Sequence, residues 1–334
     1  LGGLCAGLEA CLLCGIRVNR YYYSNPNDTA RQMTRHRLAA LSGEFPKHLP
    51  PEAWRYVFDL APNGAGNLSE TDLQRAGVGG REQWAVIAFW DGAKHEDEQL
   101  VQHVIATLRA AGKGDPEPAV LMGCKVARGE ELPSAALKRE WGEGALHDAA
   151  RFGSMLHQLY RSWSNFANAQ DCEDIMRAAT RPPDMDLSSI LEPMHLAPTT
   201  VKELRVPYHP CNQVGQVTTC LHPGGLGASG SSVSLGARYP LLNKVTADYE
   251  APSASETEKI LGYLPGSLAA PGVEQEDQRL MTSKGVDVRY LAALMATHRV
   301  LSDKARSGKS GIPYALIGVA PVSYTHLTLP TNRE

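Results

Sequence analysis

Short apolar runs alternate with helically spaced apolar residues along the first half of the chain. Three segments are rich in β-branched and aromatic residues or form unbroken apolar runs, and we expect them to be central strands: Ile16–Ser24, Trp84–Trp90 and Pro118–Met122. Between the last two, apolar residues recur at helical spacing, at Leu100, Val104, Ile105 and Leu108. This alternation predicts an α/β fold, a twisted, doubly wound mixed sheet with helices on both faces.

Capping signals mark further helices. An Ala- and Leu-rich stretch over 3–14 opens at two glycines, and Asn25 followed by proline gives a cap for a helix that runs to Leu41. Helical spacing returns over 253–261 and again over 287–300. The late helices indicate that the chain returns to the main domain after an interruption.

The interruption is a change in composition. From about 166 to 255 the chain is rich in Pro, Gly, Ser and Thr, and 221–233 is a loop-like tract. These features predict a small loop-rich lobe inserted into the main domain. We expect four parts: the main domain over 1–165, the lobe over 166–255, a helical return over 256–321 and a tail over 322–334.

The two ends of the chain have features of their own. Val322–Thr331 matches the translation of a sequencing-library adapter, so the tail is expected to carry no function. The chain starts at Leu1 without a methionine, a basic flank or a cleavage site, which indicates a fragment and not a signal peptide.

Composition and charge narrow the possible partners. The 334 residues are 43% hydrophobic and 21% charged, as is usual for a globular protein, and a formal net charge of −3 leaves any nucleic-acid binding to local patches. No run reaches the roughly 18 apolar residues of a membrane-spanning helix, so no membrane partner is expected. Cys11 and Cys14 form a Cys-x-x-Cys pair, but no second pair follows at zinc spacing, so no metal is expected.

A series of segments resembles the motifs of the DNA (cytosine-5) methyltransferases, in the family's order and over about residues 1 to 300. The similar segments are Gly2–Ala10, Arg20–Arg31, Asp148–Ser154 with His157 and Trp163–Asn165, Val206–Gly215 at the start of the target-recognition region, Pro252–Tyr263 and Gly285–Asp287. The resemblance implies a Rossmann-like, S-adenosylmethionine-dependent methyltransferase sheet with a small loop-rich target-recognition lobe, and DNA as partner. The family's preceding Phe-x-Gly would lie before Leu1.

The family's chemistry needs a thiolate that attacks C6 of cytosine and a glutamate that supports the attack. The resemblance places Gly92 at the nucleophile position, after the strand ending at Trp90, and Gly123 or Cys124 at the glutamate position. The family's Arg-x-Arg pair falls on Gln158 and Tyr160, with Arg161 displaced by one. We therefore interpret the chain as a decayed member that does not methylate DNA.

The resemblance also implies the binding residues. S-adenosylmethionine would lie at the carboxyl ends of the strands, against Gly2, Gly3, Asn25, Asn27, Gly285 and Asp287. Amides stand where the family has ribose-binding acids, which predicts weakened cofactor binding, although Asn25 also fits a simple helix cap. DNA contacts are expected from Arg161, Lys202, Arg205 and Arg238.

Three alternatives stay open. Cys211 is the cysteine of the chain's only Pro-Cys step and could serve as nucleophile in a permuted motif order, or it could be a structural thiol. The chain could instead be a non-enzymatic DNA-binding homologue that uses Lys202, Arg205, Arg238 and Lys244 on phosphates. It could also be a pseudogene fragment without function.

Overall fold

We describe the fold from a computed structural model. The structure describes residues 3–23, 27–54, 65–78, 84–91, 95–112, 117–126, 134–149, 152, 154, 158–165, 170–172, 174, 190–196, 241–247, 249–250, 252–283 and 285–307.

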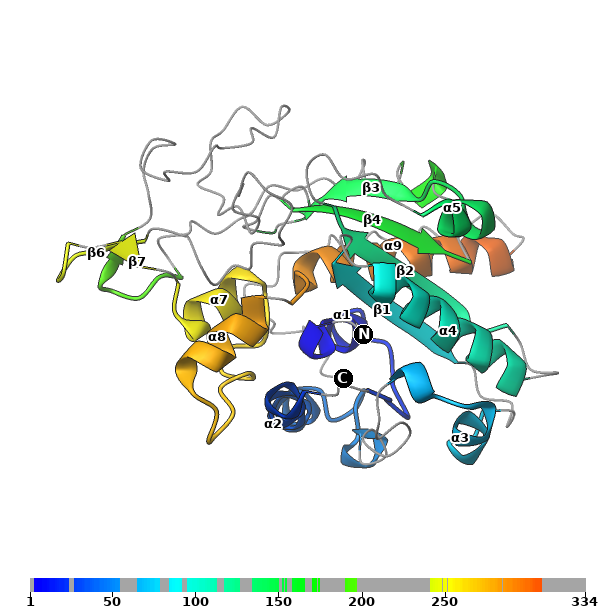
Figure 1. The fold of residues 1–334 in the computed structure, drawn as a ribbon, viewed down its shortest axis with the longest axis horizontal. Helices are drawn as coiled ribbons and strands as arrows, with labels where there is room; N and C mark the ends of the chain where they lie inside the picture. The colour runs from blue at the N-terminus through cyan, green and yellow to red at the C-terminus, as the bar shows by residue number, and fades with distance from the viewer. Residues whose placement is uncertain are drawn as a thin grey trace, which may run out of the picture.

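A four-stranded mixed sheet forms the centre of the molecule (Figure 1). Its order is β1-β2-β4-β3, with β1 (Ala85–Asp91), β2 (Ala119–Lys125), β3 (Ala145–Asp148) and β4 (Leu159–Ser164). β1 and β2 are parallel and are joined through helix α4 (His95–Ala111), whereas β4 runs antiparallel to both β2 and β3. The unbroken apolar character of β1 and β2 follows from burial of both sheet faces.

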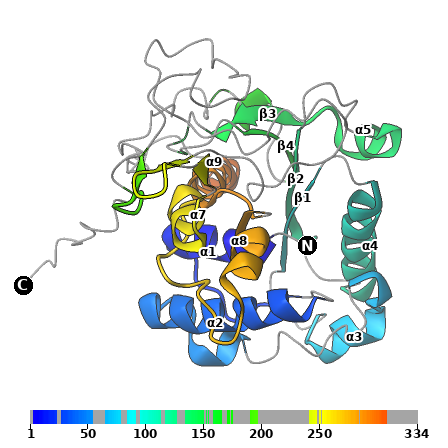
Figure 2. The same cartoon turned by 60° about the vertical axis from the view of Figure 1, so that its left-hand side comes forward.

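Helices cover the sheet on both sides, as Figure 2 shows with the sheet nearly edge-on. Ala88, Trp90, Val120 and Met122 pack towards α4 with Val101 and Ile105. Alternate residues of the same strands, Phe89 and Leu121, pack on the other face with α1 (Ala6–Leu13) and α9 (Val288–Ser307). The period of two along each strand therefore divides the core into two layers.

The remaining helices surround these layers, and several begin at a polar side chain that caps them. Asn27 accepts the amide of Ala30 at 2.9 Å, and Ser69 and Ser253 each form a capping box. The elements are η1 (Gly3–Cys5), α2 (Asp28–Glu44), η2 (Pro51–Trp54), η3 (Ala65–Asn67), α3 (Glu70–Arg75), α5 (Ala135–Trp141), α7 (Ala254–Ile260) and α8 (Gln275–Ser283).

A second, small antiparallel sheet lies beside α7. Its order is β5-β6-β7, from β5 (His195–Leu196), β6 (Leu241–Asn243) and β7 (Tyr249–Glu250). Strands this short are marginal on their own, so contacts outside the sheet must contribute to holding it.

The structure confirms most of the predicted elements and corrects two. Trp84–Trp90 and Pro118–Met122 correspond to β1 and β2, and the helices predicted over 3–14, 253–261 and 287–300 are present with small shifts in their ends. The helix expected after Asn25 is α2, whose cap is Asn27 and not Asn25.

The prediction that Ile16–Ser24 is a central strand is wrong for its described part, 16–23. The amide of Val18 donates to the carbonyl of His48 at 2.8 Å, and that of Tyr21 to the carbonyl of Ala53 at 3.0 Å. The segment's hydrogen bonds thus go to loop and 3-10 residues, without a ladder to a neighbouring strand. Within the described sheet, β1 is consequently an edge strand and not a central one.

Among the described residues, none of the helices combines the length and apolar character needed to cross a membrane.

Candidate functional site

The carboxyl ends of β1 and β2 are where the sequence places the catalytic pair. Gly92 lies outside the described residues, directly after β1. Gly123 is in β2, paired in register with Phe89 of β1. A Cβ atom on Gly123 would lie 2.5 Å from Cε1 of Phe89 and 2.7 Å from the carbonyl oxygen of Arg161. The glutamate position of the resemblance is therefore closed by a phenyl ring and by backbone.

Cys124, the other candidate for the glutamate position, faces the opposite side of the sheet. It is buried with Trp90, Met122 and Trp163 in the core layer under α4. The indole rings of Trp90 and Trp163 stack there with centroids 6.1 Å apart. Because neighbouring strand residues point to opposite faces, Cys124 and Gly123 cannot serve the same site.

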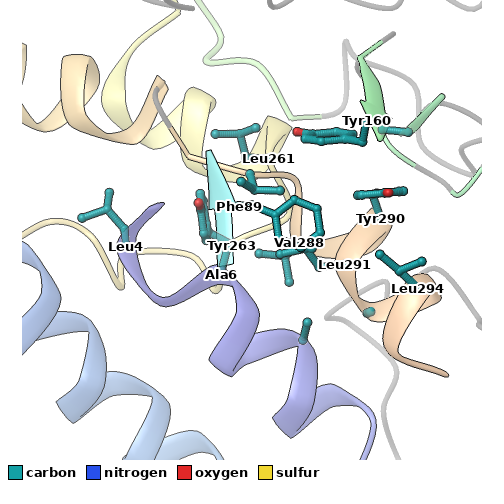
Figure 3. Close-up of a cluster of buried hydrophobic side chains, with 14 of the residues drawn as sticks. Leu4, Ala6, Phe89, Tyr160, Leu261, Tyr263, Val288, Tyr290, Leu291 and Leu294 are labelled. Atoms are coloured by element: carbon teal, nitrogen blue, oxygen red, sulfur yellow. The ribbon is translucent and has the colours of Figure 1, made fainter. Parts of the chain in front are cut away.

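An aromatic cluster fills the sheet face over Gly123 (Figure 3). The rings of Tyr160 and Tyr290 stack with centroids 4.5 Å apart, and Phe89 meets each of them edge-on, at 6.2 and 6.3 Å. Burial raises the pKa of Tyr160 well above its usual value, so its hydroxyl stays neutral. Tyr160, which the resemblance assigns to one position of an Arg-x-Arg pair, contributes packing in this cluster.

Asp287 connects this cluster to the last motif. Its carboxylate accepts the hydroxyl of Ser154 at 2.7 Å and the amide of Tyr290 at 2.9 Å, which makes it the cap of α9. The guanidinium of Arg289 lies at 4.0 Å. Burial raises the pKa of Asp287, and the hydrogen bonds and Arg289 oppose that shift. The side chain is turned into the core and engaged in structural contacts.

The other described cofactor candidates each lie at the start of a helix: Gly3 before α1, Asn27 before α2 and Gly285 before α9. Gly2 and Asn25 lie outside the described residues. Gly3 opens the turn before α1, and its successors Leu4 and Cys5 adopt left-handed conformations, with φ of 48° and 63°. The side-chain oxygen of Asn27 is used by the cap of α2. At Gly285, a Cβ would clash with the hydroxyl of Tyr263 and lie 2.9 Å from the carbonyl of Thr282.

S-adenosylmethionine needs polar groups that reach its ribose and amino acid portions, and three of the residues that the sequence predicts for this role make contacts within the protein instead. Asp287 and Asn27 are each committed to a helix cap, and Gly285 is packed against Tyr263. The structure does bring the two motifs together, because Leu4 and Val286 share one core cluster. The polar atoms of Asn27 and Asp287, however, make hydrogen bonds that stabilise the starts of α2 and α9.

The predicted DNA-binding residues are mostly outside the described part of the chain, as Lys202, Arg205, Arg238 and the alternative nucleophile Cys211 all are. Arg161 is described, and its guanidinium donates to the carbonyl of Glu143 at 2.6 Å.

Two other described side chains of the sequence-based assignments make local contacts. The amide of Gln158 donates to the carbonyl of Leu159 at 3.0 Å. The ammonium of Lys244 donates to the carbonyl of Pro193 at 2.9 Å. As for metals, the described residues contain no group of three or more side chains able to hold an ion.

Sequence reasoning missed the residues that close the site. Phe89 appeared only as part of an apolar run, and Tyr290 only as a helical position. Asp287 carried a usable signal, because an aspartate just before a helix is a frequent cap. Nothing in the sequence indicated that Ser154 would bond to it from 133 positions away.

Comparison with known proteins gives a fold and no family. No protein-family model matches the chain, and no curated protein matches it. Among solved structures, the chain is similar to the Dnmt2 methyltransferase of S. pombe, with a TM-score of 0.54, 12% identity, and 90% of this chain and 96% of that chain covered. A methyltransferase of Entamoeba histolytica, EhMeth, gives a TM-score of 0.49, 10% identity, and 91% and 96% coverage.

The fold class predicted from the sequence is confirmed. The mixed sheet with helices on both faces, together with the likeness to the S. pombe structure, gives the Rossmann-like α/β fold of S-adenosylmethionine-dependent methyltransferases. At this level of identity the likeness concerns the fold alone.

Proposed function

We propose that this protein is a DNA cytosine-5 methyltransferase-like protein that does not methylate DNA. The observation that carries the proposal is that Phe89 and the backbone of Arg161 leave no room for a Cβ atom at Gly123. Attack on a cytosine ring requires a thiolate and a group that supports ring activation. The sequence has Gly92 at the position expected for the thiolate. At the position expected for the activating group it has Gly123, where there is no room for a side chain. In this proposal residues 166–255 form a lobe that contacts DNA.

The proposal predicts that the chain forms no covalent adduct with DNA. The test is incubation with duplex DNA that carries 5-fluorocytosine, together with S-adenosylmethionine, followed by denaturing electrophoresis. An active cytosine-5 methyltransferase run in parallel should give the shifted band, and this chain should give none. Gly92→Cys alone should also give none, because groups that act as a unit fail together.

A shifted band from the unmodified chain would overturn the proposal. Loss of such a band in Cys211→Ala would then identify Cys211 as the nucleophile of a permuted site. A band that persists in Cys211→Ala would point to another thiol.

A second prediction concerns the cofactor. We expect S-adenosylmethionine to bind at least about tenfold more weakly than to an intact methyltransferase, since each missing charge-assisted hydrogen bond costs about 1.5–3 kcal/mol. Titration calorimetry on the purified chain measures this. Asn25→Asp restores an acid at the ribose position and should tighten binding, whereas ordinary micromolar affinity in the unmodified chain would contradict the prediction.

A further inference from the structure

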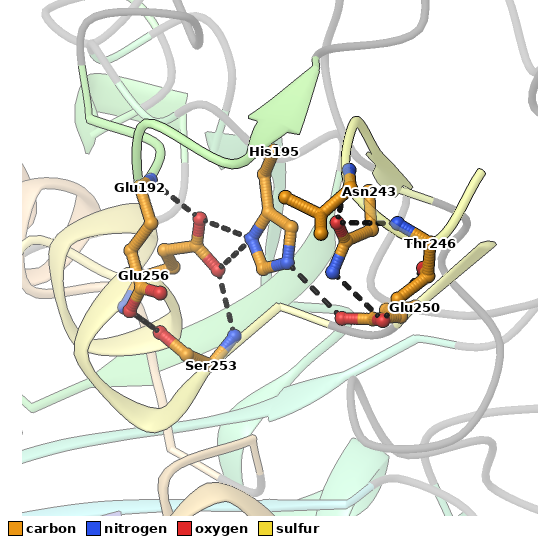
Figure 4. A network of polar contacts seen from close by, with 8 residues as sticks. Glu192, His195, Asn243, Thr246, Glu250, Ser253 and Glu256 are labelled. Atoms are coloured by element: carbon orange, nitrogen blue, oxygen red, sulfur yellow. Dashed lines mark hydrogen bonds and ion pairs between the residues drawn. The ribbon is translucent and has the colours of Figure 1, made fainter. Parts of the chain in front are cut away.

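A histidine lies between the small sheet and helix α7, and Figure 4 shows the polar network around it. His195 is in β5, with a side chain that is 4% exposed. Its Nδ1 lies 2.7 and 2.9 Å from the two carboxylate oxygens of Glu256 in α7. Its Nε2 lies 3.3 Å from Oε2 of Glu250 in β7. One imidazole ring thus connects β5 to a helix on one side and to a strand on the other.

The two carboxylates differ in what else they bind. Glu256 is fully buried and also accepts the amides of Glu192 and Ser253, each at 2.7 Å, so that it belongs to the capping box of α7. Glu250 is 40% exposed and accepts the side-chain amide of Asn243 at 2.9 Å. Glu256 is therefore held by the helix whatever the histidine does, whereas Glu250 is partly exposed and, besides the histidine, accepts from the side chains of Asn243 and Thr246.

The charges around His195 favour its protonated form. Burial lowers the pKa of His195, but hydrogen bonds and charge from Glu256, Glu250 and Glu192 outweigh burial and raise it. The hydrogen bonds from Asn243 and His195 lower the pKa of Glu250, which keeps that carboxylate ionised. Lys244, in the turn that follows β6, brings a positive charge to this region, and its ammonium donates to the carbonyl of Pro193.

We propose that His195 is a pH-sensitive clamp that ties β7 to β5, and the small sheet to α7, when both ring nitrogens carry protons. A neutral imidazole has a single N–H. That proton stays on Nδ1, facing the buried Glu256, and the bare Nε2 then faces the carboxylate of Glu250. The contact with β7 is lost, while the contact with α7 remains. The inference concerns the small sheet and does not depend on whether the chain acts on DNA.

The sign of the pH effect follows from the raised pKa. The clamp is complete below the ordinary histidine pKa of about 6.5 and is lost as pH rises through the higher value that the histidine has in the folded protein. Glu250, whose pKa is lowered by its hydrogen bonds from Asn243 and His195, stays ionised over this range. Loss of the contact between β5 and β7 at alkaline pH is therefore attributed to deprotonation of His195.

The experiment is hydrogen–deuterium exchange of the whole chain between pH 5.5 and 8.5, expressed as protection factors so that the intrinsic pH dependence of exchange is removed. Peptides covering 195–196, 241–243 and 249–250 should lose protection about three- to tenfold as pH rises, the effect of one partly exposed charge-assisted hydrogen bond. Peptides from β2 should not change. His195→Gln keeps a donor for Glu256 but does not titrate, so its small sheet should show no pH step.

A second variant keeps the test decisive if His195→Gln folds poorly. Glu250→Gln removes one of the charges that favour the imidazolium, so the pH step should move to lower pH. A small sheet whose protection is constant over the whole range, or a step that survives in His195→Gln, would overturn the proposal. So would a step in Glu250→Gln at the same pH as in the unmodified chain.

Discussion

Arg37→Met is expected to lower the free energy of unfolding by about 3–5 kcal/mol, because it breaks a buried ion pair and leaves one charge behind. The side chains of Arg37 in α2 and Glu9 in α1 are both 0% exposed, and their charged groups are in direct contact. The guanidinium also donates to the hydroxyl of Ser267 at 3.0 Å and lies 4.1 Å above the ring of Tyr263. Methionine would replace the packing but none of the charge.

The residues around the pair of Arg37 and Glu9 explain why loss of Arg37 should weaken several elements of the fold. Glu9 accepts the amide of Leu264 at 2.9 Å. Glu258 of α7 accepts the amides of Gly266 and Leu268 at 2.6 and 2.7 Å. Burial raises the pKa of Glu258, while its hydrogen bonds and the charge of Arg37 oppose that shift. Arg37 is thus the positive centre that joins α1, α2 and the turn after α7, and these elements support the sheet face under β1.

Urea denaturation followed by circular dichroism measures the effect. Arg31→Met is the matched control, since it makes the same substitution in the same helix at an ion pair with the exposed Asp28, where about 0–1 kcal/mol is expected. Glu9→Leu combined with Arg37→Met should recover part of the loss, because the carboxylate of Glu9 is then not left without its partner, although Glu258 still lacks the charge of Arg37 and the amide of Leu264 loses its acceptor. If Arg31→Met and Arg37→Met lower the free energy of unfolding equally, the buried ion pair stabilises the protein no more than the exposed one.

Particular residues show how far the sequence predicts the fold. β1 and β2 were predictable because unbroken apolar runs occur where both faces of a strand are covered. Ile16–Tyr23 has the composition of a strand, but strand formation needs a partner, and its amides are taken by His48 and Ala53. Composition reports the local preference for an extended chain and carries no information on which segment will pair with it.

The candidate site likewise has some features that the sequence predicts and others that it does not. Gly123 could be assigned from the order of motifs, but its closure depends on Phe89, its neighbour across the sheet. The stack of Tyr160 on Tyr290 joins positions 130 apart, and local patterns do not predict such a contact. Glu9 offered a signal that went unused: it is the only charged residue of α1, a helix whose other residues are apolar or glycine. A lone charge in such a helix indicates a buried partner.

Closure of the site leads to the last prediction, that Gly123→Glu destabilises the protein by about 3 kcal/mol or more and restores no methyl transfer. The new Cβ would lie 2.5 Å from a ring carbon of Phe89 and 2.7 Å from the backbone oxygen of Arg161. The oxygen cannot move without shifting β4, and the ring is packed against Tyr160 and Tyr290. The carboxylate beyond it would enter the face occupied by Tyr160 and Tyr290. Overpacking a core costs about 1–3 kcal/mol, and an unpaired buried charge adds to that.

Gly123→Ala is the matched control, because it introduces the Cβ clash without the charge and should cost the smaller, steric part. Phe89→Ala combined with Gly123→Glu removes the nearest ring but leaves the carboxylate facing the tyrosines, so it should stay less stable than Phe89→Ala alone. Urea midpoints of the four variants separate the two contributions, and transfer of a labelled methyl group to DNA reports activity. A Gly123→Glu protein as stable as the unmodified chain would mean that β1 and β4 can shift at little cost to make room for the new side chain. In that case the proposed lack of catalysis would rest on the nucleophile position alone, and the closed face over β2 would be no barrier to rebuilding the site.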